Sequence, residues 1–377
     1  MTSGLQVFDV AIIGGGIAGV SAAYHLAPTH QVVLLEQEAE LAFHTTSRSA
    51  AIYLEGGEVG GVNSRLSIAS RAFLERDHAD LDAMLLSPLG ALDVGPEELT
   101  DQLTAQAAAT SAIVPSIELV DSTQIRELCP VLRPERSVVG VWEPNAKALD
   151  AMALHQLFLR GARRNGAEIA RSSRVIELEY RGRQWLITTT KSPVRAKVVV
   201  NAAGAWGDVV GIMAGAKPLG LQPCRRTALT TTVRHEVSRW PFVYTPVDEG
   251  ACYFRPETGQ QLLCSLADET RSEPCDARAE ELDVALALDH LNALTTLDIR
   301  TVNISWAGLR TFAPDRSPVL GWDRDVADFC WMVGQGGSGI LTSPAAGESI
   351  AAIVGGDPLP DAISRLGTTK SDLAART

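Results

Sequence analysis

Residues 7–27 read VFDVAIIGGGIAGVSAAYHLA and set the architecture expected for the whole chain. Val7–Ile13 is a short run rich in β-branched residues, typical of a strand that is buried on both faces. Ile17–Ala27 continues with small and apolar residues that favour a helix. A second predicted strand, Gln31–Leu35, follows and is closed by an acid. The order strand, helix and strand predicts a β-α-β unit.

The turn between the first strand and the helix carries the spacing GxGxxG, at Gly14, Gly16 and Gly19. Gly14 permits a tight turn, Gly16 lets the backbone approach a pyrophosphate, and Gly19 lets the helix pack closely. Glu36, 22 residues after Gly14, is placed to accept a hydrogen bond from a ribose hydroxyl. An ordinary glycine turn is the alternative, but the complete order of elements predicts dinucleotide binding.

The composition restricts the class of protein. The 377 residues are 46% hydrophobic and carry a net charge of −12, from 33 basic and 45 acidic side chains. A broad nucleic-acid surface is therefore not expected, because it needs clustered Lys and Arg. No apolar run approaches the roughly 20 residues of a transmembrane helix, and the N-terminus lacks the features of a secretion signal. The six cysteines show no metal-ligand spacing, which predicts reduced thiols in a cytoplasmic protein.

Beyond the β-α-β unit the pattern predicts further helices and a closing strand with its glycine loop. The expected helices are Ser64–Arg76, Thr100–Ala109, Asp150–Asn165, Ala279–Leu294 and Ser343–Val354, and the strand is Asp328–Val333 before Gly334–Gly339. Asp150 precedes the third of these helices and Gly166 follows it, as start and stop residues do.

Several long strings resemble the flavoproteins of the D-amino-acid oxidase family, and within it the bacterial D-arginine dehydrogenases. They are LHQLFLRGARRN (154–165), NAAGAW (201–206), PLGLQPCRR (218–226), CYFRPETG (252–259), TTLDIRTVNISWAGLRTF (295–312) and QGGSGI (335–340). The resemblance covers essentially the whole chain and implies an α/β fold. It further implies a Rossmann-like FAD-binding domain of the glutathione-reductase type, expected over about 1–75, 145–220 and 305–377. An antiparallel-sheet α+β substrate domain, expected over about 76–144 and 221–304, would be interleaved with it.

The resemblance implies FAD as the cofactor, and it assigns the FAD contacts residue by residue. Besides Gly14, Gly16, Gly19 and Glu36, the implied contacts are Ser47, Arg48 and Ser49 near the pyrophosphate and flavin, Val175 at the adenine, Ala202 and Trp206 in the groove, and Gly337, Gly339, Ile340 and Thr342 at the flavin pyrimidine. A helix starting near Ser343 directs its positive end at the flavin, where reduction accumulates charge. Covalent relatives use a cysteine near Gly308–Arg310; none stands there, so we expect noncovalent FAD.

The resemblance also implies a clamp for the substrate carboxylate, made by Arg226, Tyr253 and Arg310, with the backbone of Gly337 facing the amine. A planar guanidinium suits a carboxylate because it offers two parallel hydrogen bonds. A surface charge next to Arg225 is the alternative for Arg226. Arg310 lies in an apolar stretch, where burial without a carboxylate partner is costly.

The side-chain pocket departs from the arginine-specific pattern. Ile52 replaces a histidine and Ala91 replaces the glutamate that binds guanidinium, while Leu54, Phe242 and Tyr244 add apolar surface. We therefore expect apolar or aromatic D-amino acids to be preferred over D-arginine.

The lid tyrosine of the family is replaced within Leu54–Val62, a glycine-rich stretch that predicts a mobile loop. Glu55 and Glu58 are expected to be solvated there, with entry into the pocket as the alternative. Tyr53 matches a family tyrosine and is expected to wall the pocket, unless it is a core residue.

These features predict an FAD-dependent enzyme that oxidises the C–N bond of a D-amino acid to an imine by hydride transfer to flavin N5. Sarcosine-oxidase-like oxidation of a secondary amine or an N-substituted glycine is the first alternative, and a non-catalytic flavin-binding protein is the second. The expected partner is a small amino-acid or amine substrate, while the electron acceptor, a quinone or oxygen, stays open.

Overall fold

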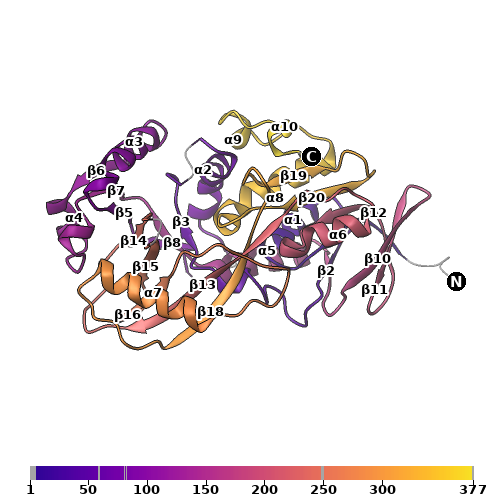
Figure 1. Ribbon diagram of the computed structural model, residues 1–377. Coiled ribbons are helices and arrows are strands. Elements are labelled where there is room, and N and C mark those ends of the chain that lie inside the picture. The colour runs from indigo at the N-terminus through magenta and orange to yellow at the C-terminus, as the bar shows by residue number, and fades with distance from the viewer. Residues whose placement is uncertain (1–5, 58–59, 80, 82, 248–249, 376–377) are drawn as a thin grey trace.

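The computed structural model describes residues 6–375 except 58–59, 80, 82 and 248–249. It contains an eight-stranded sheet, a nine-stranded sheet and a small three-stranded sheet. Figure 1 shows the hairpin of β10 (Val175–Arg181) and β11 (Gln184–Thr189) at one end of the molecule. The helices α3 (Thr100–Ser111) and α4 (Ser122–Leu128) lie at the opposite end.

The eight-stranded sheet is built around the predicted β-α-β unit. Its order is β10, β11, β12 (Val194–Asn201), β1 (Val7–Ile13), β2 (Val32–Leu35) and β9 (Glu168–Ala170), with β20 (Phe329–Val333) beside β12 and β19 (Val319–Trp322) beside β20. Strands β9, β2, β1, β12 and β20 run parallel. Both faces of β1 are buried, since Val10 and Ile12 enter one hydrophobic cluster and Ala11 and Ile13 another. The continuous apolar run of this strand follows from burial on both sides.

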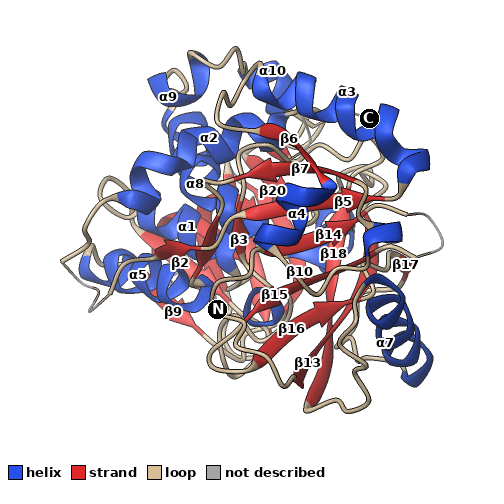
Figure 2. Ribbon diagram, turned by 90° about the vertical axis from the view of Figure 1, so that its left-hand side faces the viewer, coloured by secondary structure: helices blue, strands red, loops and turns tan. Residues whose placement is uncertain are grey.

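Four helices cover one face of this sheet: α1 (Ile17–Leu26), α2 (Val62–Glu75), α5 (Ala151–Arg164) and α8 (Gly339–Gly355). Figure 2 shows them together on one side of the molecule. Small residues allow the close packing, because a Cβ on Gly347 of α8 would lie 2.1 Å from Oγ of Ser21. The helix α6 (Gly207–Met213) packs on the other face, and the short α9 (Asp361–Ser364) and α10 (Lys370–Leu373) follow α8.

The nine-stranded sheet is mostly antiparallel. Its order is β17 (Thr270–Arg271), β13 (Gln222–Thr232), β16 (Gln261–Ser265), β15 (Cys252–Pro256), β14 (Phe242–Thr245), β5 (Ala91–Gly95), β7 (Val139–Glu143) and β6 (Glu118–Asp121), with β18 (Ile304–Phe312) along β13. The helix α7 (Glu281–Leu294) packs against its β13 and β15. The three-stranded sheet joins β3 (Ile52–Tyr53), β8 (Lys147–Leu149) and β4 (Leu86–Pro88).

The α/β fold class with a second, largely antiparallel sheet is confirmed. The division into two interleaved domains stays a prediction. The strands of the eight-stranded sheet come from the residues predicted for the FAD-binding domain, and those of the nine-stranded sheet come from the residues predicted for the substrate domain. The exception is β18, which lies in the predicted FAD-binding residues but pairs with β13 over nine positions. Within the described residues, no helix is both long enough and apolar enough to cross a membrane.

The start of α8 differs from the prediction by four residues. The sequence pattern predicted a helix start near Ser343. The helix instead begins at Gly339 and carries Pro344 inside it. Proline has no N–H for the carbonyl of Ile340, and Oγ of Ser343 donates to that carbonyl at 2.8 Å instead. The preceding serine thus allows the helix to start earlier.

Candidate cofactor and substrate site

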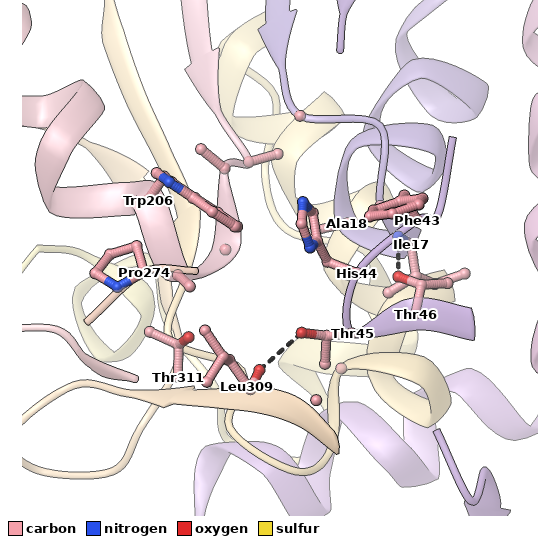
Figure 3. Close-up of a pocket in the computed structure, with 18 of the residues that line it drawn as sticks. Ile17, Ala18, Phe43, His44, Thr45, Thr46, Trp206, Pro274, Leu309 and Thr311 are labelled. Carbon is pink, nitrogen blue, oxygen red and sulfur yellow. Dashed lines mark hydrogen bonds between the residues drawn. The ribbon is translucent and has the colours of Figure 1, made fainter. Parts of the chain in front are cut away.

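A cavity of about 670 Å³ lies where the carboxyl ends of β1, β2 and β12 meet the strand β18 (Figure 3). Its volume is in the range of cofactor and ligand sites, roughly 300–1,000 Å³. The glycine turn after β1 forms one wall, and the glycine loop after β20 forms another. In parallel sheets, ligands bind at the carboxyl ends of the strands, which is where this cavity lies.

Gly14 and Gly19 cannot be replaced by a residue with a Cβ unless backbone atoms move. Gly14 has a φ of +110°, and a Cβ there would lie 2.4 Å from the carbonyl oxygen of Ala202. A Cβ on Gly19 would lie 1.9 Å from the carbonyl oxygen of Gly14, so the helix α1 packs directly on the turn. The N–H of Ile17 donates to Oγ1 of Thr46 at 3.0 Å. Sequence reasoning did not select Thr46, whose role depends on a contact 29 residues away.

Glu36 is buried at the end of β2 and lines the cavity. Its carboxylate accepts hydrogen bonds from the N–H of Gly15 (2.7 Å) and of Glu38 (2.8 Å). Each oxygen uses one acceptor site in these bonds, which leaves acceptor capacity for a ribose hydroxyl. The geometry therefore suits the role predicted for Glu36.

His155 of α5 supports the same turn from behind. The side chain is fully buried, and its Nε2 donates to the carbonyl oxygen of Gly15 at 3.0 Å. Burial lowers the pKa of His155, so the ring is neutral at pH 7. The string LHQLF identified the family but gave no reason to assign this contact.

The structure places most of the predicted FAD contacts around the cavity. Those lining it are Gly14, Gly16, Glu36, Arg48, Ser49, Val175, Ala202, Trp206, Gly337, Gly339 and Ile340. Gly19, Ser47 and Thr342 do not line it. Oγ of Ser47 points to the carbonyl oxygens of Phe43 and His44, and Oγ1 of Thr342 donates to the carbonyl oxygen of Ser338 at 2.8 Å. Direct contact of these three residues with the cofactor stays a prediction.

Arg48 touches the cavity, but its guanidinium is engaged elsewhere. Nη1 donates to the carbonyl oxygens of Ala277 (2.8 Å) and Ala307 (2.9 Å), and Nη2 pairs with Asp276 at 2.5 Å. Arg48 therefore ties three distant segments together at the rim of the cavity. This differs from a side chain aimed at the pyrophosphate, because four of its hydrogen bonds go to protein oxygens.

Arg310 projects from β18 next to the glycine loop. A Cβ on Gly337 would lie 3.0 Å from Nη1 of Arg310, so the guanidinium lies directly against the backbone of Gly337. No described carboxylate forms an ion pair with Arg310. Burial, and then the charge of Arg226, lower the pKa of Arg310. A cation held in a cavity without a protein partner is a binding site for an anion.

Arg226 and Tyr253 lie near Arg310 on the same face of the nine-stranded sheet. Arg226 stands opposite Gly308 in the β13–β18 pairing, two positions from Arg310. Nε of Arg226 donates to the carbonyl oxygen of Asp268 at 2.6 Å, and Nη2 pairs with Glu269 at 3.3 Å. The side chain is only 12% exposed, so it is not the surface charge considered as the alternative. Its role toward a substrate stays a prediction, as does that of Tyr253.

The comparisons with known proteins agree with this geometry. Residues 9–353 match the family model described as DAO, FAD dependent oxidoreductase. The chain belongs to this family. Mouse mitochondrial dimethylglycine dehydrogenase is 27% identical over 94% of the chain, which spans less than half (43%) of that protein's length. Glycine oxidase of Geobacillus kaustophilus is 24% identical over 92% of the chain and 93% of its own length. The crystal structure of glycine oxidase from that organism superposes with a TM-score of 0.81 at 22% identity, over 93% of this chain and 95% of that one.

FAD, the cofactor of this family of oxidoreductases, fits the residues present. The turn after β1 leaves no room for a Cβ at Gly14, and α1 begins beside it, so the positive N-terminal end of this helix suits a pyrophosphate. The helix α8 also begins at the cavity, with Gly339 and Ile340 in the lining. Specific likeness to the D-arginine dehydrogenases stays a prediction.

We expect the FAD of this family member to be bound without a covalent link. None of the six cysteines lines the cavity, and Cys330 is completely buried in the core of β20. Precipitation with acid is expected to release all of the yellow flavin into the supernatant. Flavin that stays with the washed protein pellet would contradict this prediction.

The predicted pocket residues gather in one hydrophobic cluster next to the cavity. The cluster contains Ile52, Leu54, Ala91, Phe242 and Tyr244 together with Tyr253 and Trp306. Strand pairing explains the gathering, since Ala91 stands beside Phe242 and Tyr244 beside Tyr253. None of the five is in the lining of the cofactor cavity itself, and Tyr253 belongs to both sets. Their contact with a substrate stays a prediction.

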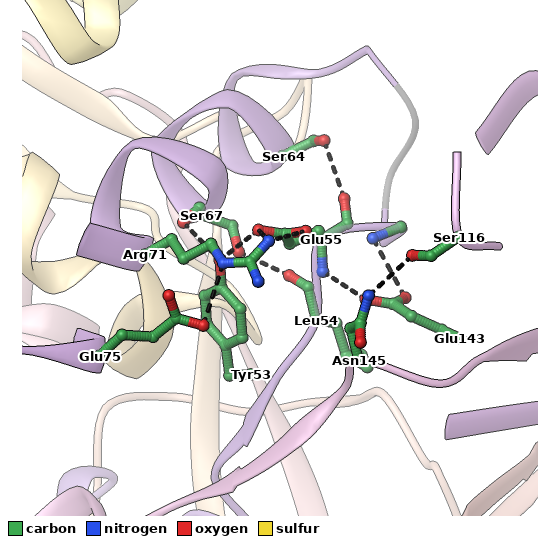
Figure 4. A network of polar contacts seen from close by, with 11 residues as sticks. Tyr53, Leu54, Glu55, Ser64, Ser67, Arg71, Glu75, Ser116, Glu143 and Asn145 are labelled. Atoms are coloured by element: carbon green, nitrogen blue, oxygen red, sulfur yellow. Dashed lines mark hydrogen bonds and ion pairs between the residues drawn. The ribbon is translucent and has the colours of Figure 1, made fainter. Parts of the chain in front are cut away.

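Tyr53 lies in the core rather than on a wall of the cavity (Figure 4). It is 2% exposed, and its hydroxyl donates to Oε1 of Glu55 at 2.8 Å. Burial raises the pKa of Tyr53, so the phenol stays protonated. The competing interpretation of Tyr53 as a core residue fits this placement.

Glu55 was expected to be solvated, and that expectation is wrong. The residue is 7% exposed and pairs with Arg71 of α2 at 3.3 Å. Its N–H and that of Gly56 donate to the carboxylate of Glu143, at 2.7 and 3.1 Å, which fixes the start of the predicted mobile loop to β7 (Figure 4). Glu58 lies outside the described residues.

Asp93 on β5 gives a test of pH-dependent stability. Burial raises its pKa from 3.8 to about 6, and Nε2 of Gln106 donates to its carboxylate at 2.7 Å. The folded state therefore disfavours ionised Asp93, so its stability falls as the pH rises from about 4 to 6. Asp93→Asn keeps an acceptor for Gln106, and we expect it to raise the free energy of unfolding by about 2–3 kcal/mol at pH 8.

At pH 4 most of the gain from Asp93→Asn is expected to disappear, because Asp93 is protonated in the folded protein and partly protonated in the unfolded chain. Chemical denaturation at both pH values measures the difference, with exposed Asp289→Asn as the control. An equal gain at pH 4 and pH 8 would show that charge is not its cause.

Proposed function

We propose that the protein is an FAD-dependent oxidoreductase that converts the C–N bond of a D-amino acid to an imine, which water then hydrolyses to a 2-oxo acid. One observation carries the proposal. The guanidinium of Arg310 has no ion-pair partner among the described residues, and it lies against Gly337 in the cavity whose lining fits FAD. Such a cation suits the carboxylate of an amino acid, which brings the neighbouring C–N bond to the cofactor.

The residues of the chain supply orientation for this reaction. When bound, FAD accepts the hydride that leaves the substrate Cα. Arg310 binds the substrate carboxylate through two parallel hydrogen bonds, and the hydroxyl of Tyr253 adds a third donor. The backbone of Gly337 faces the amine. Arg226 adds positive charge near the carboxylate while Glu269 neutralises part of it.

The hydrophobic cluster supports a preference for apolar side chains. Ala91 and Phe242 are buried in it, and their neighbours Ile52 and Leu54 are half-buried. Transfer of an apolar side chain into such surroundings gains about 1.5–3 kcal/mol. Transfer of an unpaired guanidinium costs at least as much. D-Leu, D-Met and D-Phe are therefore the proposed substrate class.

Oxidation of a secondary amine or of an N-substituted glycine is the second candidate. It is favoured by the likeness to dimethylglycine dehydrogenase and glycine oxidase, whose names point to small substrates. The same carboxylate clamp serves both reactions. A glycine-sized substrate has no side chain to contact the hydrophobic cluster, which is why we prefer the D-amino acid as the substrate.

An anaerobic flavin-reduction screen tests the two candidates. Purified holoprotein is mixed with each D-amino acid, and with glycine, sarcosine, dimethylglycine and proline, while flavin absorbance is followed. Fast bleaching by D-Leu, D-Met or D-Phe supports the first proposal. Bleaching by sarcosine or dimethylglycine alone would replace it with the second, and no bleaching by any compound would contradict both.

Substitution at Ala91 tests which part of the protein faces the substrate side chain. We expect apolar D-amino acids to exceed D-Arg in kcat/KM by about tenfold or more, which corresponds to about 1.4 kcal/mol. Ala91→Glu is expected to raise kcat/KM for D-Arg and to lower it for D-Leu, because it adds a carboxylate at the cluster.

Ala91→Gln is the matched control, since it has the same size without the charge. FAD content reports that both variants fold. Greater activity of the unaltered protein on D-Arg than on every apolar D-amino acid would contradict the apolar pocket. Asp93, beside Tyr244 in the β5–β14 pairing, would then be the carboxylate to examine.

A further inference from the structure

Two polar side chains in the lining of the cavity have buried polar atoms without a hydrogen-bond partner among the described residues. They are Nδ1 of His44 and Oγ1 of Thr311. Figure 3 shows the two side chains on opposite sides of the same chamber. Buried polar atoms are almost always paired, so each of these atoms needs a partner that the protein does not supply.

The ring of His44 is fixed in place from three sides. Nε2 donates to Oε1 of Glu38 at 3.0 Å. The ring centroid lies 4.8 Å from that of Trp206 and 5.0 Å from that of Phe43. In the tautomer that donates its Nε2–H to Glu38, Nδ1 is a hydrogen-bond acceptor. The partner that fits an acceptor is a hydroxyl group.

The position of the two residues indicates which part of the cofactor they meet. Thr46 binds the first turn of α1, and Oγ1 of Thr45 donates to the carbonyl oxygen of Leu309 at 2.8 Å. The loop that carries His44 therefore runs from the pyrophosphate end of the cavity to β18. Thr311 follows Arg310 on β18. Both side chains thus line the same cavity as the glycine turn and Arg310.

We propose that His44 and Thr311 bind the ribityl chain of FAD, with Nδ1 of His44 accepting a hydrogen bond from a ribityl hydroxyl and Thr311 pairing with a second one. Glu38 is the positioning residue that fixes the tautomer of His44. Trp206 lines the same cavity and packs against the imidazole ring of His44 (Figure 3). The inference concerns cofactor affinity and does not depend on the substrate proposed above.

The test measures the affinity of the apoprotein for FAD and for ADP, which has the adenosine half but no ribityl chain. His44→Phe keeps an aromatic ring but removes both nitrogens, and with them the bond to Glu38, while Thr311→Val replaces the hydroxyl with a methyl group. Each variant is expected to bind FAD about threefold to tenfold more weakly, as the loss of one hydrogen bond predicts, with ADP binding unchanged. His44→Gln retains an amide acceptor and is expected to lose less than His44→Phe.

The controls are His30→Phe, outside the cavity, and Thr231→Val, whose hydroxyl donates to the carbonyl oxygen of Thr301 in the same sheet as Thr311. Both are expected to bind FAD normally. The melting temperature of the apoprotein distinguishes a role of Thr311 in FAD binding from a role in the stability of the fold. Apoprotein Thr311→Val is expected to melt at a higher temperature, because a buried hydroxyl without a hydrogen-bond partner among the described residues is removed.

Three results would count against the inference. Unchanged FAD affinity in both His44→Phe and Thr311→Val would remove these residues from the cofactor site. Equal weakening of FAD and ADP would assign them to the adenosine half. A lower melting temperature of apoprotein Thr311→Val would instead show a structural role for that hydroxyl.

Discussion

Replacement of Arg310 by Lys is expected to lower kcat/KM by about 30- to 1,000-fold while the protein keeps its full content of FAD. The loss corresponds to about 2–4 kcal/mol, typical when a buried charged hydrogen-bond pair is disrupted. Lysine retains the charge but replaces a planar two-point contact with a single flexible ammonium. The backbone of Gly337, against which the guanidinium lies, is left uncovered.

Flavin absorbance measures the FAD content of Arg310→Lys, and single-turnover reduction measures the chemical step. Arg316→Lys is the matched control, because that guanidinium pairs with Glu269 at 3.0 Å and is half exposed. Its kcat/KM is expected to stay near that of the unaltered protein. Near-normal turnover of Arg310→Lys would remove Arg310 from the carboxylate site.

Gly14→Ala is expected to give a protein that is purified without FAD. The added Cβ would lie 2.4 Å from the carbonyl oxygen of Ala202, and a φ of +110° is strained for any side chain. The turn must shift, and the N–H groups at the start of α1 then lose their alignment with the pyrophosphate. The ratio of flavin to protein absorbance measures the loss.

Gly166→Ala separates the two causes of this loss. Gly166 has a φ of +86°, but a Cβ there meets no atom within 4 Å. It therefore carries the backbone strain without the collision, and we expect normal FAD content. Circular dichroism checks that both variants are folded. Folded Gly14→Ala with one FAD per chain would contradict the role given to the turn.

The parts that were predictable from the sequence are those where neighbouring residues determine the structure. The β-α-β unit is an example, because its strand, glycine turn and helix form within about 30 residues. The helix α5 is another, since Asp150 caps it with hydrogen bonds to the N–H groups of Met152 and Ala153. Both were predicted within one or two residues.

The errors concern side chains whose partners are distant in the sequence. Glu55 looked like a solvated loop residue, yet Arg71 and Glu143 from two other elements bury it. The bonds of the Arg48 guanidinium to the segments near 276 and 307 were not predicted either, while the place of Arg48 beside the cofactor stays a prediction. Local sequence carries no information on such contacts, because they arise only when the sheets and helices pack.

The separation between the hydrophobic cluster and the cofactor cavity has a consequence for how this enzyme can change. The strands β3, β5 and β14 provide Ile52, Ala91 and Phe242 to the cluster, and none of their described residues lines the cavity. Under the proposed function, mutations in these strands are expected to alter the preferred amine without lowering flavin occupancy. Substrate range and cofactor retention can thus evolve independently, and a variant library confined to these three strands is the economical route to new specificities.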